Sequence, residues 1–165
     1  MTEERRFHAT SMKCSFGIDQ NQRPCEDAAC SVCSIGQTSF KLEHAGGGPL
    51  FANLGHLRYG RGLYFSKTSS KSHDYGVGSE RVRQGERHRC MFLCKVALGS
   101  PLQTREAQIQ DVELDGLIRA RGHGGAHDSV VGLTRAQGGS LNHEESVVYS
   151  EEAALPSYLI VYKYR

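Results

Sequence analysis

A stretch in the middle of the chain, Gly60–Tyr75, constrains the fold more than any other part of the sequence. It begins with two closely spaced glycines, Gly60 and Gly62, continues as a short apolar run, Leu63–Phe65, and ends in a segment rich in serine. Glycine has no Cβ and therefore permits the close approach of a ligand or a neighbouring backbone. The apolar run is typical of a short strand, and the serines from Ser69 onward favour the first turn of a short helix.

Two aromatic rings and one hydroxyl in this stretch are placed to form a small pocket. Ser72 and Tyr75 are three residues apart and share one face of the predicted helix, while Tyr64 lies on the strand beside the glycines. Two tyrosine rings can hold a flat heteroaromatic ring, since offset stacking contributes about 0.5 to 1.5 kcal/mol per pair. Ser72 can then bind a polar substituent, as on nicotinamide. The alternative is a strand and a helix whose tyrosines belong to the core.

Two distant segments carry further polar groups that need a function. Arg6–Thr10 places His8 at the end of a predicted strand, and Glu145 begins an alternating strand in which Glu145, Val147 and Tyr149 share one face. A carboxylate among apolar neighbours must be paired or used in chemistry, because its unpaired burial is costly.

These motifs, taken in order, resemble those of the catalytic domain of the poly(ADP-ribose) polymerase-like ADP-ribosyltransferases, the diphtheria-toxin-like branch with a His-Tyr-Glu triad. His8-Ala-Thr10 resembles the family's His-Gly-Thr/Ser, and Tyr59-Gly-Arg-Gly-Leu-Tyr-Phe65 resembles Phe-Gly-x-Gly-Ile-Tyr-Phe. Ser70-Lys-Ser-His-Asp-Tyr75 matches Ser-Lys-Ser-x-x-Tyr outright. The closing segments Glu145–Tyr149 and Pro156–Tyr162 resemble the last two motifs of the family, and the resemblance spans residues 5 to 164.

The resemblance implies an α+β fold in which two antiparallel β-sheets form an NAD cleft, with few short helices. It also implies cleavage of the bond between nicotinamide and ribose in NAD, the co-substrate, and transfer of ADP-ribose to an acceptor. Such a reaction passes through an oxocarbenium-like state, so that a carboxylate near the ribose stabilises charge in the transition state. We expect a protein acceptor and the transfer of single units, with a nucleic-acid acceptor as another option.

The resemblance assigns catalysis to Glu145, His8 and Tyr64. Glu145 is expected to bind the 2′-hydroxyl of the nicotinamide ribose and to help deprotonate the acceptor, while His8, assisted by Thr10, binds the ribose on the adenine side. Tyr64 and Tyr75 are expected to flank the nicotinamide ring. The six residues expected to contact NAD are His8, Ala9, Thr10, Tyr64, Ser72 and Tyr75.

Ala9 departs from the family pattern, which has glycine before the Thr or Ser. The alanine is harmless if the backbone is extended there, and it weakens NAD binding if that residue needs a positive φ. The chain also begins only a few residues before His8, where family domains usually start with another strand and helix. These departures leave an alternative function open, that of a catalytically weak NAD-binding or protein-interaction domain that keeps the fold.

Four cysteines near the start of the chain form a candidate metal site. Cys14, Cys25, Cys30 and Cys33 follow the pattern C-x10-C-x4-C-x2-C, and the closing C-x2-C has the spacing at which two thiolates meet one tetrahedral Zn²⁺. We expect a structural zinc; the alternative is that these are buried apolar residues or free thiols. Cys90 and Cys94, on one face of an apolar strand, are expected in the core.

Length and charge agree with one ADP-ribosyltransferase catalytic domain over residues 1–165 that carries a cysteine-rich loop at 14–33. The chain has 20 basic and 18 acidic residues, a net charge of +2, so no strong field attracts nucleic acid or an anionic membrane. There is neither an apolar stretch long enough to span a bilayer nor a signal-peptide pattern. We therefore expect an intracellular protein with no membrane partner.

The remaining elements are predicted from apolar periodicity. We expect a helix over Glu26–Gln37, a buried strand over Cys90–Leu98, and strands over 145–149 and 157–164. The basic segment Arg81–Arg89 is read as a solvated hairpin. By resemblance, the glycine-rich loop His44–Arg58 lies beside the nicotinamide-ribose side of the donor site.

Overall fold

The computed structural model describes residues 3–46, 57–122 and 124–164. Within these ranges the protein consists mainly of strands with a few short helices, as predicted for an α+β fold. The strands are β1 (Glu3–His8), β2 (Leu63–Ser66), β3 (Arg81–Arg83), β4 (Glu86–Ala97), β5 (Pro101–Thr104), β6 (Ser129–Gly132), β7 (Glu145–Val148) and β8 (Ala154–Lys163). The α-helices are α1 (Ser31–Thr38), α3 (Ser69–Tyr75) and α4 (Asp111–Leu117), and the short 3₁₀ helices are Leu42–His44, Gly76–Ser79, Arg135–Gln137 and Glu151–Ala153.

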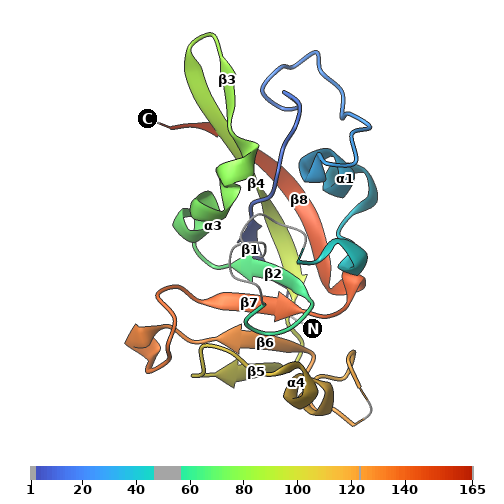
Figure 1. Ribbon diagram of the computed structural model, residues 1–165, viewed down its shortest axis with the longest axis vertical. Coiled ribbons are helices and arrows are strands. Elements are labelled where there is room, and N and C mark those ends of the chain that lie inside the picture. The colour runs from blue at the N-terminus through green and yellow to red at the C-terminus, as the bar shows by residue number, and fades with distance from the viewer. Residues whose placement is uncertain (1–2, 47–56, 123, 165) are drawn as a thin grey trace.

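The strands form two halves that join at one point. The first half contains β3, β4 and β1, with β8 also paired to β4, and the second half contains β2, β7, β6 and β5 (Figure 1). β1 and β2 connect the halves through a single register pair, Phe7 opposite Ser66. The two predicted sheets are therefore hydrogen-bonded to each other at this point, which lies beside the site described below.

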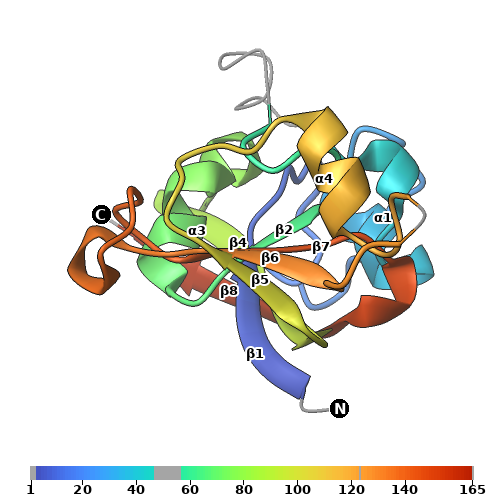
Figure 2. The same cartoon turned by 90° about the horizontal axis from the view of Figure 1, so that it is seen from below.

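The expectation of purely antiparallel sheets was wrong for one pair, because β5 and β6 run parallel. Parallel neighbours need a long crossover connection, and residues 105–128 supply it. They contain α4, in the segment Asp111–Ile118 whose pattern is ambiguous in the sequence. The helix covers one face of the second half (Figure 2), where Leu114 and Ile118 pack against Val130 and Val147.

Helix α1 begins later than the predicted Glu26. The carboxylate of Asp27 accepts a hydrogen bond from the Ala29 amide at 2.8 Å, and the Asp27 carbonyl accepts one from the Cys30 amide at 2.9 Å. These bonds form a turn that competes with the helix. Ala28 and Ala29 consequently lie exposed before the helix, which starts at Ser31.

The core next to β1 is built from β4, β2 and the α1 segment. Cys90 and Cys94 are fully buried in it, as predicted, together with Phe65 and Phe92. The ring of Phe40, which follows α1, packs edge-on against Phe65 with a centroid distance of 5.2 Å. Aromatic packing of this kind fixes the position of the α1 segment against β2.

The other predicted elements agree with the structure where it describes them. β3 and β4 form the hairpin expected over Arg81–Arg89, with an exposed turn at Gln84 and Gly85. Residues 47–56 of the loop predicted over 44–58 lie outside the described residues. None of the helices described is both long and apolar enough to cross a bilayer.

Candidate active site

A small open pocket lies where the ends of β1, β2 and β7 meet the helix α3. The residues that line it are Phe7, His8, Ala9, Tyr64, Phe65, Ser66, Lys71, Ser72, Tyr75 and Glu145. Six of the residues predicted from the sequence to bind NAD or catalyse are among them: His8, Ala9, Tyr64, Ser72, Tyr75 and Glu145. The remaining one, Thr10, is partly buried and does not line the pocket.

Strand register brings these distant segments together. Across β2 and β7 Ser66 lies opposite Glu145, and across β1 and β2 Ser66 lies opposite Phe7. The end of β1, the end of β2 and the start of β7 therefore lie at one place. Only Lys67 and Thr68 separate β2 from α3, so the chain turns back sharply and places Ser72 beside the strand ends.

Glu145 has two carboxylate oxygens in different environments. Its side chain is almost completely buried, and Oε1 accepts a hydrogen bond from Nζ of Lys71 at 2.8 Å. Among the residues that the structure describes, Oε2 is buried without a hydrogen-bond partner, and Nε of Arg58 lies 3.9 Å from it. Buried polar atoms are almost always satisfied. The free oxygen is thus positioned to accept a hydrogen bond from a ligand.

Lys71 lines the pocket but is not among the site residues predicted from the sequence. Its partner is Glu145 itself, and the lysine ammonium also lies 5.8 Å from the centroid of the Tyr75 ring. The signal was present in the sequence: Lys71 stands inside the Ser70–Tyr75 motif, one helical turn before Tyr75.

Tyr64 contributes its ring to the pocket while its hydroxyl holds the adjoining turn. The hydroxyl donates to the Gly60 carbonyl at 2.8 Å and accepts from the Tyr59 amide at 3.0 Å. Burial is the main cause that raises the pKa of Tyr64 well above its usual range, so the phenol stays neutral. The structure therefore uses the hydroxyl for local stability and leaves the ring for ligand contact.

The two glycines before Tyr64 serve backbone packing. Gly60 has a φ of +63°, in the left-handed region that favours glycine. A Cβ on Gly62 would lie 2.6 Å from Cγ1 of Val147 and 3.0 Å from the Val148 carbonyl oxygen. Gly62 thus allows the close approach of the chain entering β2 to β7, and with it the register that places Glu145 in the pocket.

His8 is held as a neutral imidazole of known tautomer. Its Nδ1 lies 2.8 Å from the Tyr64 carbonyl oxygen, which can only accept, so Nδ1 carries the proton and Nε2 has a free lone pair. Burial lowers the pKa of His8, outweighing the opposite effect of this hydrogen bond. The rings of Phe40 and Phe65 pack against the imidazole at centroid distances of 5.1 and 5.6 Å. His8 therefore offers an acceptor to a ligand hydroxyl.

Ser72 and Tyr75 extend from one face of α3, as the three-residue spacing predicts. Ser72 is buried, whereas Tyr75 is 37% exposed and stands at the rim. Burial, reinforced by the negative charge of Glu145, raises the pKa of Tyr75 to about 12. The phenol is therefore neutral at physiological pH and presents an uncharged aromatic face.

Ala9 does not need the conformational freedom of glycine here. The described non-glycine residues with positive φ are Ser39 and Gln84, and Ala9 is not among them. Its φ lies in the range that alanine adopts without strain. The substitution of the family's glycine is thus compatible with this backbone.

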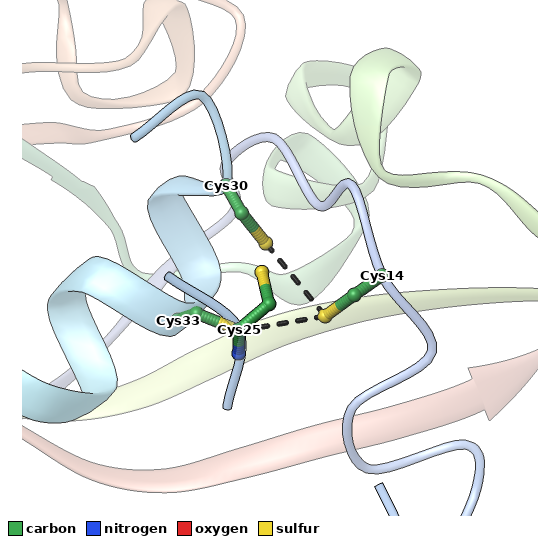
Figure 3. A group of neighbouring side chains, drawn as sticks. All are labelled: Cys14, Cys25, Cys30 and Cys33. Carbon is green, nitrogen blue, oxygen red and sulfur yellow. Dashed lines mark hydrogen bonds between the residues drawn. The ribbon is translucent and has the colours of Figure 1, made fainter. Parts of the chain in front are cut away.

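The four cysteines predicted to hold metal also meet, away from the pocket. Their Sγ atoms all lie within 4.8 Å of one another (Figure 3). None of the four lines the pocket. All six cysteines of the chain are free thiols in the structure, so each Sγ of this cluster is available as a ligand.

Comparison with known families agrees with this geometry. The model of the family described as the poly(ADP-ribose) polymerase catalytic domain matches residues 48–164, more than half of the chain. The matched range contains Tyr64, Ser72, Tyr75 and Glu145, while His8 precedes it. The chain belongs to the poly(ADP-ribose) polymerase catalytic domain family.

Proposed function

We propose that this protein is an NAD-dependent ADP-ribosyltransferase that cleaves the nicotinamide–ribose bond and transfers ADP-ribose to an acceptor. Membership of the family supports the activity in general. The observation that carries the proposal for this chain is Oε2 of Glu145, which is buried at the pocket and has no hydrogen-bond partner in the part of the chain that the structure describes. A free buried carboxylate oxygen beside two aromatic rings suits a ligand with a flat ring joined to a hydroxylated sugar.

The nicotinamide ring is proposed to lie between Tyr64 and Tyr75. Ser72 and the backbone of Ala9 bind its carboxamide, so the leaving group is held on several sides. At the other end of the pocket, Nε2 of His8 accepts a hydrogen bond from the ribose on the adenine side, with Thr10 assisting. The neutral state of His8 suits this role, because an imidazolium has no acceptor.

The catalytic step is proposed to depend on Glu145. Its Oε2 accepts a hydrogen bond from the 2′-hydroxyl of the nicotinamide ribose, and this bond strengthens as positive charge develops on the ribose. The bond between C1′ and the ring nitrogen breaks, and its electron pair leaves with nicotinamide. The acceptor nucleophile then bonds to C1′ and loses its proton, with Glu145 as base. Lys71 positions the carboxylate from the opposite oxygen.

We propose a protein acceptor and the transfer of single units. The near balance of 20 basic and 18 acidic residues supports a protein over a nucleic acid, since nucleic-acid binding draws most of its affinity from basic surfaces.

Incubation of the full chain with labelled NAD and a protein mixture tests the proposal. We expect labelled protein from the natural sequence and labelling reduced at least about 10²-fold in Glu145→Gln. Glu113→Gln, which changes an exposed residue on α4, is the control and should label as strongly as the natural sequence. Phosphodiesterase digestion of the product distinguishes a single ADP-ribose from a chain.

The same assay separates the other functions. NAD binding without turnover indicates the weak NAD-binding or interaction domain and contradicts the proposal. Label on RNA or DNA ends would identify a nucleic acid as the acceptor, and release of free ADP-ribose would identify water. Either result contradicts the proposed protein acceptor.

A further inference from the structure

We propose that Cys14, Cys25, Cys30 and Cys33 bind one structural Zn²⁺ and that this ion fixes the wall of the pocket that contains His8. The binding of the ion stands independently of the enzymatic activity. Only its consequence for the pocket rests on the proposed function.

The sulfur positions match a tetrahedral site. A Zn–S distance of about 2.3 Å implies sulfur–sulfur separations of about 3.8 Å in a tetrahedron. Sγ of Cys14 lies 3.9 Å from Sγ of Cys30 and 3.4 Å from Sγ of Cys33. Every pair in the cluster is within 4.8 Å, and Figure 3 shows the four side chains converging from separate parts of the backbone. The ligand set therefore needs only small adjustments to close around one ion.

Backbone amides support the sulfur atoms as thiolates. The amide of Lys13 donates to Sγ of Cys30 at 3.2 Å, and the amide of Cys25 donates to Sγ of Cys33 at 3.3 Å. Hydrogen bonds from the surrounding protein stabilise and orient metal ligands. They also partly offset the net negative charge of four thiolates around a divalent ion.

The two remaining cysteines show what an ordinary core thiol looks like in this protein. Cys90 and Cys94 are buried on β4 among apolar side chains, and the sulfur of Cys90 contacts Sδ of Met12 at 3.6 Å. In the cluster, by contrast, Cys14 and Cys25 are only partly buried and all four sulfurs face one another. The open side gives an ion access, while four protein ligands leave no free coordination position, which characterises a structural zinc.

The segment that carries the ligands has little regular secondary structure. Residues 9–30 contain neither a helix nor a named strand, and loops of this length without regular structure are uncommon in compact domains. The helix that follows, α1, has eight residues and no side-chain hydrogen bond at its N-cap, Cys30. Isolated helices this short are unstable. Ligands at Cys30 and Cys33 attach its first turn to the loop through the ion.

The same segment leads directly to the pocket. Phe40, just beyond α1, is 2% exposed and packs edge-on against the His8 ring at 5.1 Å. Cys33 and Val32 of α1 belong to the same buried cluster as Phe40. An ion that fixes α1 therefore holds Phe40 against His8. Binding involves no redox change: the thiols lose their protons, and four sulfur–zinc bonds form.

Metal analysis of the full chain, purified with reductant and without added chelator, tests the site. We expect one zinc per chain in the natural protein. The double variant Cys14→Ser/Cys33→Ser should lose most or all of this zinc. Cys94→Ala, which removes a buried cysteine outside the cluster, is the matched control and should keep one zinc. Zinc retained by the double variant, iron in place of zinc, or a zinc-free natural chain that stays zinc-free after incubation with one equivalent of Zn²⁺ overturns the proposal.

A spectroscopic measurement covers the case in which the double variant does not fold. The natural chain, stripped of metal and titrated with Co²⁺, should show the visible bands of a tetrahedral, all-thiolate site, saturating at one equivalent. Bands of an octahedral site contradict the ligand set.

The consequence for the pocket is read from binding of nicotinamide to the metal-free and metal-loaded chain. Weaker binding without zinc supports the coupling through Phe40. Equal binding contradicts the coupling through Phe40 but not the zinc site itself. A failure of the coupling can therefore be distinguished from a failure of the metal site.

Discussion

The ammonium nitrogen of Lys71 lies 2.8 Å from Oε1 of Glu145, and both side chains are largely buried. The other carboxylate oxygen of Glu145 has no hydrogen-bond partner within residues 3–46, 57–122 and 124–164. The carboxylate is thus anchored through one oxygen by Lys71 of α3, while its second oxygen stays buried at the pocket.

Replacing Lys71 by Met should impair both stability and catalysis. Removing one partner of a buried ion pair leaves an uncompensated charge and costs about 3–5 kcal/mol. A displacement of the carboxylate by about 1 Å can lower the rate by about 10²-fold. Urea unfolding and steady-state kinetics measure the two effects. Lys67→Met, at an exposed neighbouring position, should change neither; equal behaviour of the two variants would contradict the anchoring role.

Replacing Tyr64 by Phe should separate the hydroxyl from the ring. The variant loses the bonds to the Gly60 carbonyl and the Tyr59 amide, which should lower the free energy of unfolding by about 2 kcal/mol. The KM for NAD should stay close to that of the natural protein, because the ring is retained. Tyr158→Phe, on an exposed tyrosine, serves as the control. A large rise in KM in Tyr64→Phe indicates instead that the hydroxyl binds substrate.

Replacing Ala9 by Gly, the residue of the family pattern, should bring no gain in NAD affinity. The backbone at Ala9 does not have a positive φ, so glycine only adds freedom to the unfolded chain. The expected loss of stability is about 0.4–1 kcal/mol. Titration calorimetry with a nicotinamide analogue and thermal unfolding measure both quantities. Markedly tighter binding by Ala9→Gly contradicts the conclusion that alanine is harmless.

Replacing Gly62 by Ala should destabilise the protein through overpacking. The new methyl group would lie 2.6 Å from Cγ1 of Val147, and an extra methyl in a packed interior costs about 1–3 kcal/mol. Gly36→Ala is the control, since a Cβ there meets nothing within 4 Å and alanine favours the helix by about 0.5–1 kcal/mol. Denaturant unfolding of both variants gives the comparison, and a Gly62→Ala protein as stable as the natural one contradicts the packing described.

Acidification should lower the free energy of unfolding through protonation of His8. Burial lowers its pKa in the folded state, so below the unfolded value of about 6.5 the unfolded chain binds more protons at this residue. Above the unfolded pKa, the contribution of His8 to the free energy of unfolding is fully present. It is lost as the pH falls from the unfolded pKa to the lower pKa of the folded state. Unfolding free energies at pH 7.5 and 5.5 should differ more for the natural chain than for His8→Gln. An identical pH dependence in both proteins is the contrary result.

Local sequence was sufficient wherever short-range spacing decides which face a side chain occupies. The three-residue step from Ser72 to Tyr75 on a helix and the alternation from Glu145 to Val147 on a strand placed these residues correctly. The same holds for Cys90 and Cys94, which are buried as their spacing on β4 predicts. Motifs of this kind depend only on the period of the element that carries them.

Two predictions from the sequence were wrong, each for its own reason. The Asp27 turn displaced the start of α1, because a side-chain acceptor near a helix start offers the amides another partner. The strands β5 and β6 run parallel, which their long connection permits, and the periodicity within each strand contains no information about the direction of its neighbour.

The sequence by itself determined the residue types of the pocket and of the cysteine cluster, and through the joined motifs the fold class. Tertiary structure alone decided that Lys71 pairs with Glu145, that Oε2 has no partner among the described residues, and that Phe40 packs against His8. The reason is physical. These contacts join residues far apart in the chain, so they depend on strand register and on the packing of whole elements, which no local pattern specifies.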